Sequence, residues 1–157
     1  MNAPHPYLFT YGTLRPGSRQ IMSRVLTCHA RHLGPATVAG SLFDLGEFPG
    51  AVPPLHEDDS IRGDLFYLNH PRVLLELLDN YEGCGERDAP PHLFRRELAP
   101  ARLADGTSYM AWVYWYGGDV AHCTQIPGGD YLALLAREEL APAGIDPGVL
   151  INLDGAI

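Results

Sequence analysis

A long predicted β-hairpin, spanning residues 93–116, is the feature that most constrains the fold of this sequence. Two β-rich runs, 93–103 and 108–116, flank Asp105-Gly106, and an Asp-Gly pair between such runs is a strong hairpin signal. Residues 111–116 are almost all aromatic or β-branched, which is typical of a central strand buried on both faces. The hairpin therefore predicts the centre of a β-sheet.

Further strands are predicted on the N-terminal side of this hairpin. Aromatic residues alternate with Leu8 and Thr10 over 7–11. Residues 36–46 and 61–68 also indicate extended chain, the former with an interruption at Gly40. The segment 48–53, FPGAVP, is rich in proline and glycine, which predicts a loop that leaves the sheet.

Three segments carry helical signals. The strongest is 70–83, with Pro71 near its start and Gly83 just after its end. A second helix is expected over 19–30 with Ser18 as its cap, and a third near the C-terminus. The apolar face predicted for the strongest helix consists of Val73, Leu74, Leu77, Leu78 and Tyr81.

Strands that come mostly in hairpins, with few helices between them, favour an α+β fold over a doubly wound one. We expect a curled, mixed or mainly antiparallel sheet with two or three flanking helices. A small closed barrel is its expected form, since closure removes exposed sheet edges. A chain of 157 residues with 46% hydrophobic residues can bury a core of its own, which predicts a single domain over residues 1–157.

The charge and the cysteines narrow the functional classes. A net charge of −8 provides no broad positive surface, so nucleic acid and anionic membranes are not expected partners. The N-terminal residues do not resemble a signal peptide, and no apolar run is long enough for a membrane span. Cys28, Cys84 and Cys123 are odd in number and far apart, which predicts reduced thiols in the cytoplasm. The oligomeric state stays open.

Familiar catalytic motifs are absent from the sequence. Cys28, His29 and His32 lie close together, but no second ligand pair accompanies them, so no metal site is expected. There is no G-x-S-x-G, Walker or G-x-G-x-x-G motif. A Cys84–His92 pair is the one arrangement in which a thiol nucleophile has a nearby base, and hydrolysis through it is one alternative.

Two short stretches carry more specific signals. The loop 12–17 joins a strand to a helix, so its backbone N–H groups could hold a carboxylate or phosphate, although a plain turn is the alternative. Glu82 follows the strongest helix, where the helix dipole disfavours its ionised form, and Asp79 three residues earlier is expected to raise its pKa further. The alternative for Glu82 is a solvated surface carboxylate.

Five stretches taken together resemble the gamma-glutamylcyclotransferase-like, or AIG2-like, family. They are LFTYGTLRPG at 8–17, GSLFDLGEFPGAV at 40–52, IRGDLFYL at 61–68, LDNYEG at 78–83 and FRRELAPARLADGTSYMAWVYWY at 94–116. The resemblance covers about the first three quarters of the chain and implies a mixed β-barrel with a cavity at its mouth.

The resemblance also implies site residues and a reaction. Tyr11, Gly12, Thr13 and Leu14 match the family's substrate-binding loop, and Glu82 matches its catalytic acid/base. In the family's reaction, the α-amine of a γ-glutamyl group attacks its own side-chain amide, which gives 5-oxoproline and releases an amine or amino acid. No cofactor is required, and the expected partner is a small γ-glutamyl molecule.

Three further residues are connected with the predicted pocket. Tyr116 is predicted to point its hydroxyl into the cavity, with a core position as the alternative. Arg15 could meet a carboxylate, with an exposed side chain as the alternative. Phe94 departs from the tyrosine of many relatives. A binding or regulatory module that keeps the barrel without turnover is the rival functional hypothesis. The tail from about Ala141 matches no known pattern.

Overall fold

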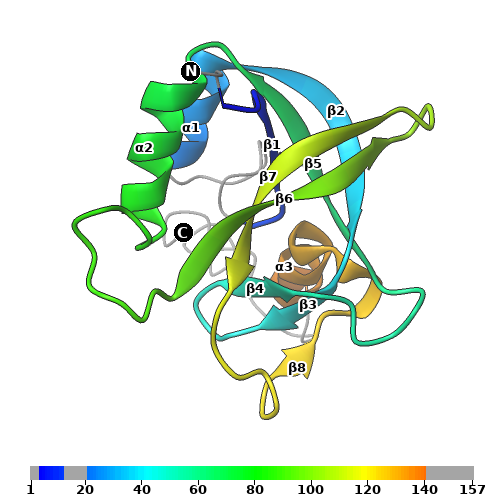
Figure 1. Cartoon of the computed structure of the whole chain (residues 1–157). Coiled ribbons are helices and arrows are strands. Elements are labelled where there is room, and N and C mark those ends of the chain that lie inside the picture. The colour runs from blue at the N-terminus through cyan, green and yellow to red at the C-terminus, as the bar shows by residue number, and fades with distance from the viewer. Residues whose placement is uncertain (1–3, 13–20, 141–157) are drawn as a thin grey trace.

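Five strands close into a barrel in the computed structural model, which describes residues 4–12 and 21–140 (Figure 1). The described elements are, in chain order, β1 (Tyr7–Thr10), α1 (Ile21–His29), β2 (Ala30–Ala39), β3 (Ser41–Asp44), β4 (Pro49–Val52), β5 (Ser60–Leu68), α2 (Pro71–Tyr81), β6 (Phe94–Leu103), β7 (Ser108–Tyr116), β8 (Thr124–Gln125), a 3₁₀ turn (Pro127–Gly129) and α3 (Tyr131–Leu140). Ser18 and the tail from Ala141 lie outside the described residues, and one domain over 1–157 stays a prediction.

The barrel consists of β1, β5, β2, β6 and β7, each paired with the next. Four of these pairings are antiparallel, and a parallel contact between β1 and β7, with Leu8 opposite Trp112, closes the barrel. The predicted α+β fold with a closed, mixed barrel is therefore confirmed. The hairpin of β6 and β7 is also confirmed, with its turn at Asp105-Gly106.

One edge of β7 is shared by two strands, which creates a discontinuity that we call the seam. Strand β1 pairs with this edge at Trp112, and β4 pairs with it at Trp115, so the seam is the stretch of β7 between these residues. Beyond the seam, the sheet continues from β4 to β3 and β8 (Figure 1). The barrel wall thus changes from one strand to another at Tyr114.

Side chains alternate between two hydrophobic cores on either side of the barrel wall. Phe9 and Val113 belong to the core inside the barrel, whereas Leu8 and Tyr114 belong to an outer core between the barrel and helices α1 and α2. The predicted burial of β7 on both faces is confirmed at residues 113–115, which are at most 6% exposed. Helix α2 is held against the barrel by the outer core.

Helix α2 has the predicted position but a different buried face. Leu74, Leu75 and Leu78 are buried, whereas Val73 is 70% exposed and Leu77 is 44% exposed. The apolar stripe of this helix is wider than the surface that it covers, so the docking angle on the barrel decides which leucines are buried. Tyr81 is also exposed, at 42%, so the prediction that Val73, Leu77 and Tyr81 belong to the core face is wrong.

The prediction that residues 48–53 leave the sheet is also wrong. Pro49 begins β4 and lies opposite Asp44 on β3, and all four residues of β4 are buried. A proline is tolerated as the first residue of a strand because no ladder hydrogen bond from its nitrogen is required there. The predicted interruption at Gly40 is confirmed, since it separates β2 from β3.

None of the helices in the described parts of the chain is long and apolar enough to span a bilayer.

Candidate functional site

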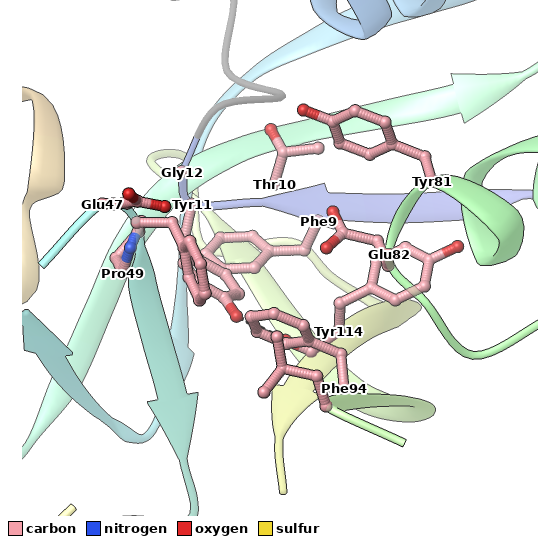
Figure 2. A pocket seen from close by; sticks show the side chains of 12 residues that line it. Phe9, Thr10, Tyr11, Gly12, Glu47, Pro49, Tyr81, Glu82, Phe94 and Tyr114 are labelled. Carbon is pink, nitrogen blue, oxygen red and sulfur yellow. Dashed lines mark hydrogen bonds between the residues drawn. The ribbon is translucent and has the colours of Figure 1, made fainter. Parts of the chain in front are cut away.

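A cavity of about 380 Å³ opens at the seam, where the ends of three elements meet (Figure 2). The end of β1 forms one wall, the segment entering β4 forms another, and the C-terminal end of α2 forms the third. Tyr114 and Phe94 from the hairpin also line it. The cavity therefore lies where the partner of β7 changes from β1 to β4.

Glu82 brings a carboxylate to this cavity from the end of α2. Its amide donates a hydrogen bond of 2.8 Å to the Leu78 carbonyl, which fixes the backbone of the last helical turn. The side chain lines the cavity, where burial raises the pKa of Glu82 to about 7. A carboxyl group with this pKa can both accept and donate a proton near neutral pH.

Asp79 does not act on Glu82 in the predicted way. Its carboxylate accepts two hydrogen bonds from the Arg96 guanidinium, at 2.7 and 3.1 Å, and one of 2.8 Å from the Tyr114 hydroxyl. Arg96 in turn stacks on Trp112, with 4.2 Å from its Cζ atom to the ring centre. Asp79 is thus committed to an ion pair that ties α2 to the hairpin, and burial, rather than repulsion from Asp79, raises the pKa of Glu82.

Tyr11 uses its hydroxyl to bridge the seam. The hydroxyl donates a hydrogen bond to the carbonyl of Tyr114 on β7 and accepts one of 3.3 Å from the amide of Ala51 on β4. One side chain therefore connects a backbone carbonyl of β7 with a backbone amide of β4. Burial and the nearby Glu82 raise the pKa of Tyr11 far above its usual range, so the hydroxyl stays protonated.

Gly12 follows Tyr11 and lines the cavity beside Pro49. A Cβ atom at Gly12 would lie 2.9 Å from the Pro49 Cγ atom, which is closer than real carbon atoms approach. Glycine therefore lets the chain leave β1 close to the start of β4. Of the predicted site residues, Tyr11, Gly12 and Glu82 line one cavity, while Thr13, Leu14 and Arg15 lie outside the described residues.

The sequence predicts that Tyr116 reaches the cavity, but in the structure Tyr114 occupies that position. Tyr116 packs against Phe94 in the outer core, and its hydroxyl lies over Gly118, where an added Cβ would come within 2.3 Å. Tyr114, two residues earlier on the same side of β7, lines the cavity together with Phe94. Alternation along the strand could have indicated Tyr114 as readily as Tyr116, but it does not say where the cavity begins.

Sequence reasoning missed several residues that line the cavity. Thr10 is one of them. Its position as a polar residue between Phe9 and Tyr11 in a buried strand could have indicated a cavity residue. Glu47 and Leu93 come from loops, and no sequence pattern places their side chains at the cavity. The hydroxyl of Thr10 is buried without a hydrogen-bond partner among the described residues.

The alternative thiol mechanism receives no geometric support. The Cys84 sulfur contacts an oxygen of Asp79 at 3.9 Å, while the Nε2 atom of His92 is bonded to the Asp88 carbonyl at 2.9 Å. Burial, followed by the charges of Asp79 and Glu82, raises the pKa of Cys84 to about 11, which disfavours a thiolate nucleophile. Among residues 4–12 and 21–140, no three His, Cys, Asp or Glu side chains gather as metal ligands would.

A closed barrel with a carboxylate in a seam cavity defines a class of small β-barrel protein with room for a small molecule. Within that class, the chain belongs to the gamma-glutamyl cyclotransferase, AIG2-like family, whose sequence profile matches residues 8–133. The family resemblance predicted from the motifs is therefore confirmed. A search of curated proteins finds no significant match.

Solved structures show the same fold at low sequence identity. YkqA from Bacillus subtilis is 20% identical with a TM-score of 0.66, and the match covers 88% of this chain and 44% of YkqA. An AIG2-like protein from Mus musculus is 18% identical with a TM-score of 0.65, covering 91% of this chain and 95% of the mouse chain. A gamma-glutamyl cyclotransferase is 13% identical with a TM-score of 0.55, covering 98% of this chain and all of that one (100%). The chain thus spans less than half the length of YkqA.

Proposed function

We propose that this protein is a gamma-glutamylcyclotransferase that converts a γ-glutamyl amine or γ-glutamyl amino acid to 5-oxoproline. Family membership supports the reaction class. The single observation that carries the proposal is Glu82, a half-buried carboxyl group with a pKa of about 7 in the same cavity as Gly12.

The proposed reaction requires little more than positioning and proton transfer. The ionised Glu82 removes a proton from the substrate α-ammonium, and the free amine attacks the γ-amide carbonyl to form the new C–N bond. Glu82 returns this proton to the leaving nitrogen as the bond from that nitrogen to the carbonyl carbon breaks. The new ring nitrogen gives its second, excess proton to the released amine, which departs as an ammonium. Because nucleophile and electrophile belong to one molecule, holding the substrate folded supplies much of the rate enhancement. The reaction as written needs no cofactor.

The end of the cavity beside Gly12 suits the substrate α-carboxylate in this proposal. Backbone N–H groups bind anions in a protein of any net charge, and the sequence motif that contains Gly12 is expected to supply them. Glu82 then lies where the amine and the leaving nitrogen would be. A cytoplasmic location stays a prediction and rests on the unpaired Cys28, Cys84 and Cys123.

The deciding experiment compares wild type with Glu82→Gln on γ-glutamylalanine and γ-glutamylbutylamide, with 5-oxoproline as the measured product. We expect the variant to lose about 10²- to 10⁴-fold in kcat, the usual contribution of a general acid–base group. Glu76→Gln is the matched control, because Glu76 is an exposed carboxylate on α2 that does not line the cavity.

Two outcomes would contradict the proposal. Full turnover by Glu82→Gln would exclude Glu82 as the acid/base. Binding of both compounds by the wild type without any 5-oxoproline would instead identify a binding module on the same barrel.

A further inference from the structure

Thr10 presents a buried hydroxyl that nothing in the described protein satisfies. It is the last residue of β1 and only 3% exposed, and it lines the seam cavity. Its Oγ1 atom is the only buried side-chain oxygen or nitrogen atom without a hydrogen-bond partner among the described residues. A hydroxyl removed from water without a partner destabilises a fold, so such a group in a cavity wall indicates a missing ligand atom.

The other buried hydroxyl groups of the cavity are already engaged. Tyr11 bridges the seam, and Tyr114 donates to Asp79. Neither can turn toward a ligand without losing a buried hydrogen bond. Thr10 is therefore the buried hydroxyl that is free to bind a substrate.

The position of Thr10 indicates which substrate atom it would meet. Figure 2 shows Thr10 between Gly12, on one side, and Glu82, on the other. In the proposed reaction the α-carboxylate lies at the Gly12 end and Glu82 acts on the α-amine. Both groups are attached to one carbon atom, so the region between Gly12 and Glu82 holds that carbon and its nitrogen.

We propose that the Thr10 hydroxyl binds the α-amino nitrogen of the γ-glutamyl substrate as a second acceptor beside Glu82. This inference rests on the proposed function and extends it to a specific contact. The ammonium gives one proton to Glu82 and keeps another N–H bonded to Thr10 Oγ1. That remaining bond fixes the rotation of the amine, so that its lone pair points at the carbonyl carbon. Thr10 is thus a substrate-binding residue that selects for an α-amine.

The first test measures stability without any substrate. Thr10→Val replaces the hydroxyl with a methyl group of similar size, and it removes the unsatisfied oxygen. We expect Thr10→Val to unfold at a higher urea concentration than the wild type, whereas Thr10→Ser, which keeps the hydroxyl, does not. A lower unfolding midpoint for Thr10→Val would show that the hydroxyl has a structural partner and would overturn the inference.

The second test asks whether the hydroxyl recognises the amine. The probes are γ-L-glutamylbutylamide, as substrate, and its analogue with hydrogen in place of the α-amino group, as a competitive inhibitor. We expect Thr10→Val to lower kcat/KM for the substrate about ten- to hundredfold, as for a hydrogen bond to a charged group. The inhibition constant of the analogue should change less than about twofold, and Thr10→Ser should restore most of kcat/KM.

Thr37→Val is the matched control, since Thr37 is a half-buried strand residue that does not line the cavity. It should leave both constants unchanged. An unchanged kcat/KM in Thr10→Val, with an active wild type, would overturn the role of Thr10 alone. An equal loss for substrate and analogue would also overturn recognition of the amine. A wild type that forms no 5-oxoproline would overturn the proposed function and the inference with it.

Discussion

Burial raises the pKa of Glu82, and this lowers the unfolding free energy of the protein at neutral pH. Its pKa is raised from 4.5 to about 7 in the folded protein. Folding therefore favours the protonated form, and this contribution is complete below about pH 4.5 and is lost as the pH rises to about 7. The group that suits proton transfer thus weakens the fold at the pH at which it would work.

Glu82→Gln should therefore stabilise the protein in a pH-dependent way. Glutamine mimics the protonated carboxyl, so the variant should exceed the wild type by about 3 kcal/mol in unfolding free energy near pH 8 and by little near pH 4. Urea unfolding across this pH range measures the difference. Glu76→Gln, on the exposed side of α2, should show no such trend. A Glu82→Gln difference that does not grow with pH would mean that the carboxyl is solvated.

At the level of secondary-structure elements, the hydroxyl group of Tyr11 connects β7 with β4 across the seam. Tyr11→Phe would leave the Ala51 amide and the Tyr114 carbonyl without their partner. We expect a loss of about 1–3 kcal/mol in unfolding free energy, the usual penalty of unsatisfied buried groups, together with a lower kcat/KM as Gly12 shifts. Tyr67→Phe is the control, because Tyr67 is half-buried on β5 away from the cavity. Equal stability of Tyr11→Phe and wild type would show that water can replace the hydroxyl.

The elements that the sequence predicts well are those with local signals. The β6–β7 hairpin has an Asp-Gly turn, and α2 has a proline at its start and a glycine after its end. The two errors, the buried face of α2 and the strand at Pro49, depend on contacts between distant segments. Periodicity alone cannot tell which of several leucines faces the barrel, nor that a Pro-Gly segment is paired on both sides.

The candidate site was predictable only where the motifs contain its residues. Tyr11, Gly12 and Glu82 come from two motifs about seventy residues apart, and only the closed barrel brings them to one cavity. The burial of Thr10 and the Asp79–Arg96 ion pair arise from packing between strands and α2. No spacing rule within a single segment encodes these contacts.

At the scale of the whole molecule, the net charge of −8 should influence which substrates arrive quickly. A γ-glutamyl amine with an uncharged leaving group is a zwitterion with no net charge, whereas a γ-glutamyl amino acid carries one negative charge. Raising NaCl from about 20 to about 200 mM screens the repulsion of the anion, so kcat/KM for γ-glutamylalanine should rise about twofold. The value for γ-glutamylbutylamide should stay constant. A rise for both compounds would point to an effect of salt on the protein itself.

The two hydrophobic cores have different roles. The inner core fills the barrel, and the outer core holds the helix that carries Glu82. Strand closure encloses the inner core, whereas α2, docked on the outer core, holds Glu82 in the half-buried position that raises its pKa. A chain with its barrel formed and α2 undocked would hold an ordinary glutamate, fully ionised at neutral pH and a poor proton donor. The proposed proton transfer would therefore require the docked helix as well as the closed barrel.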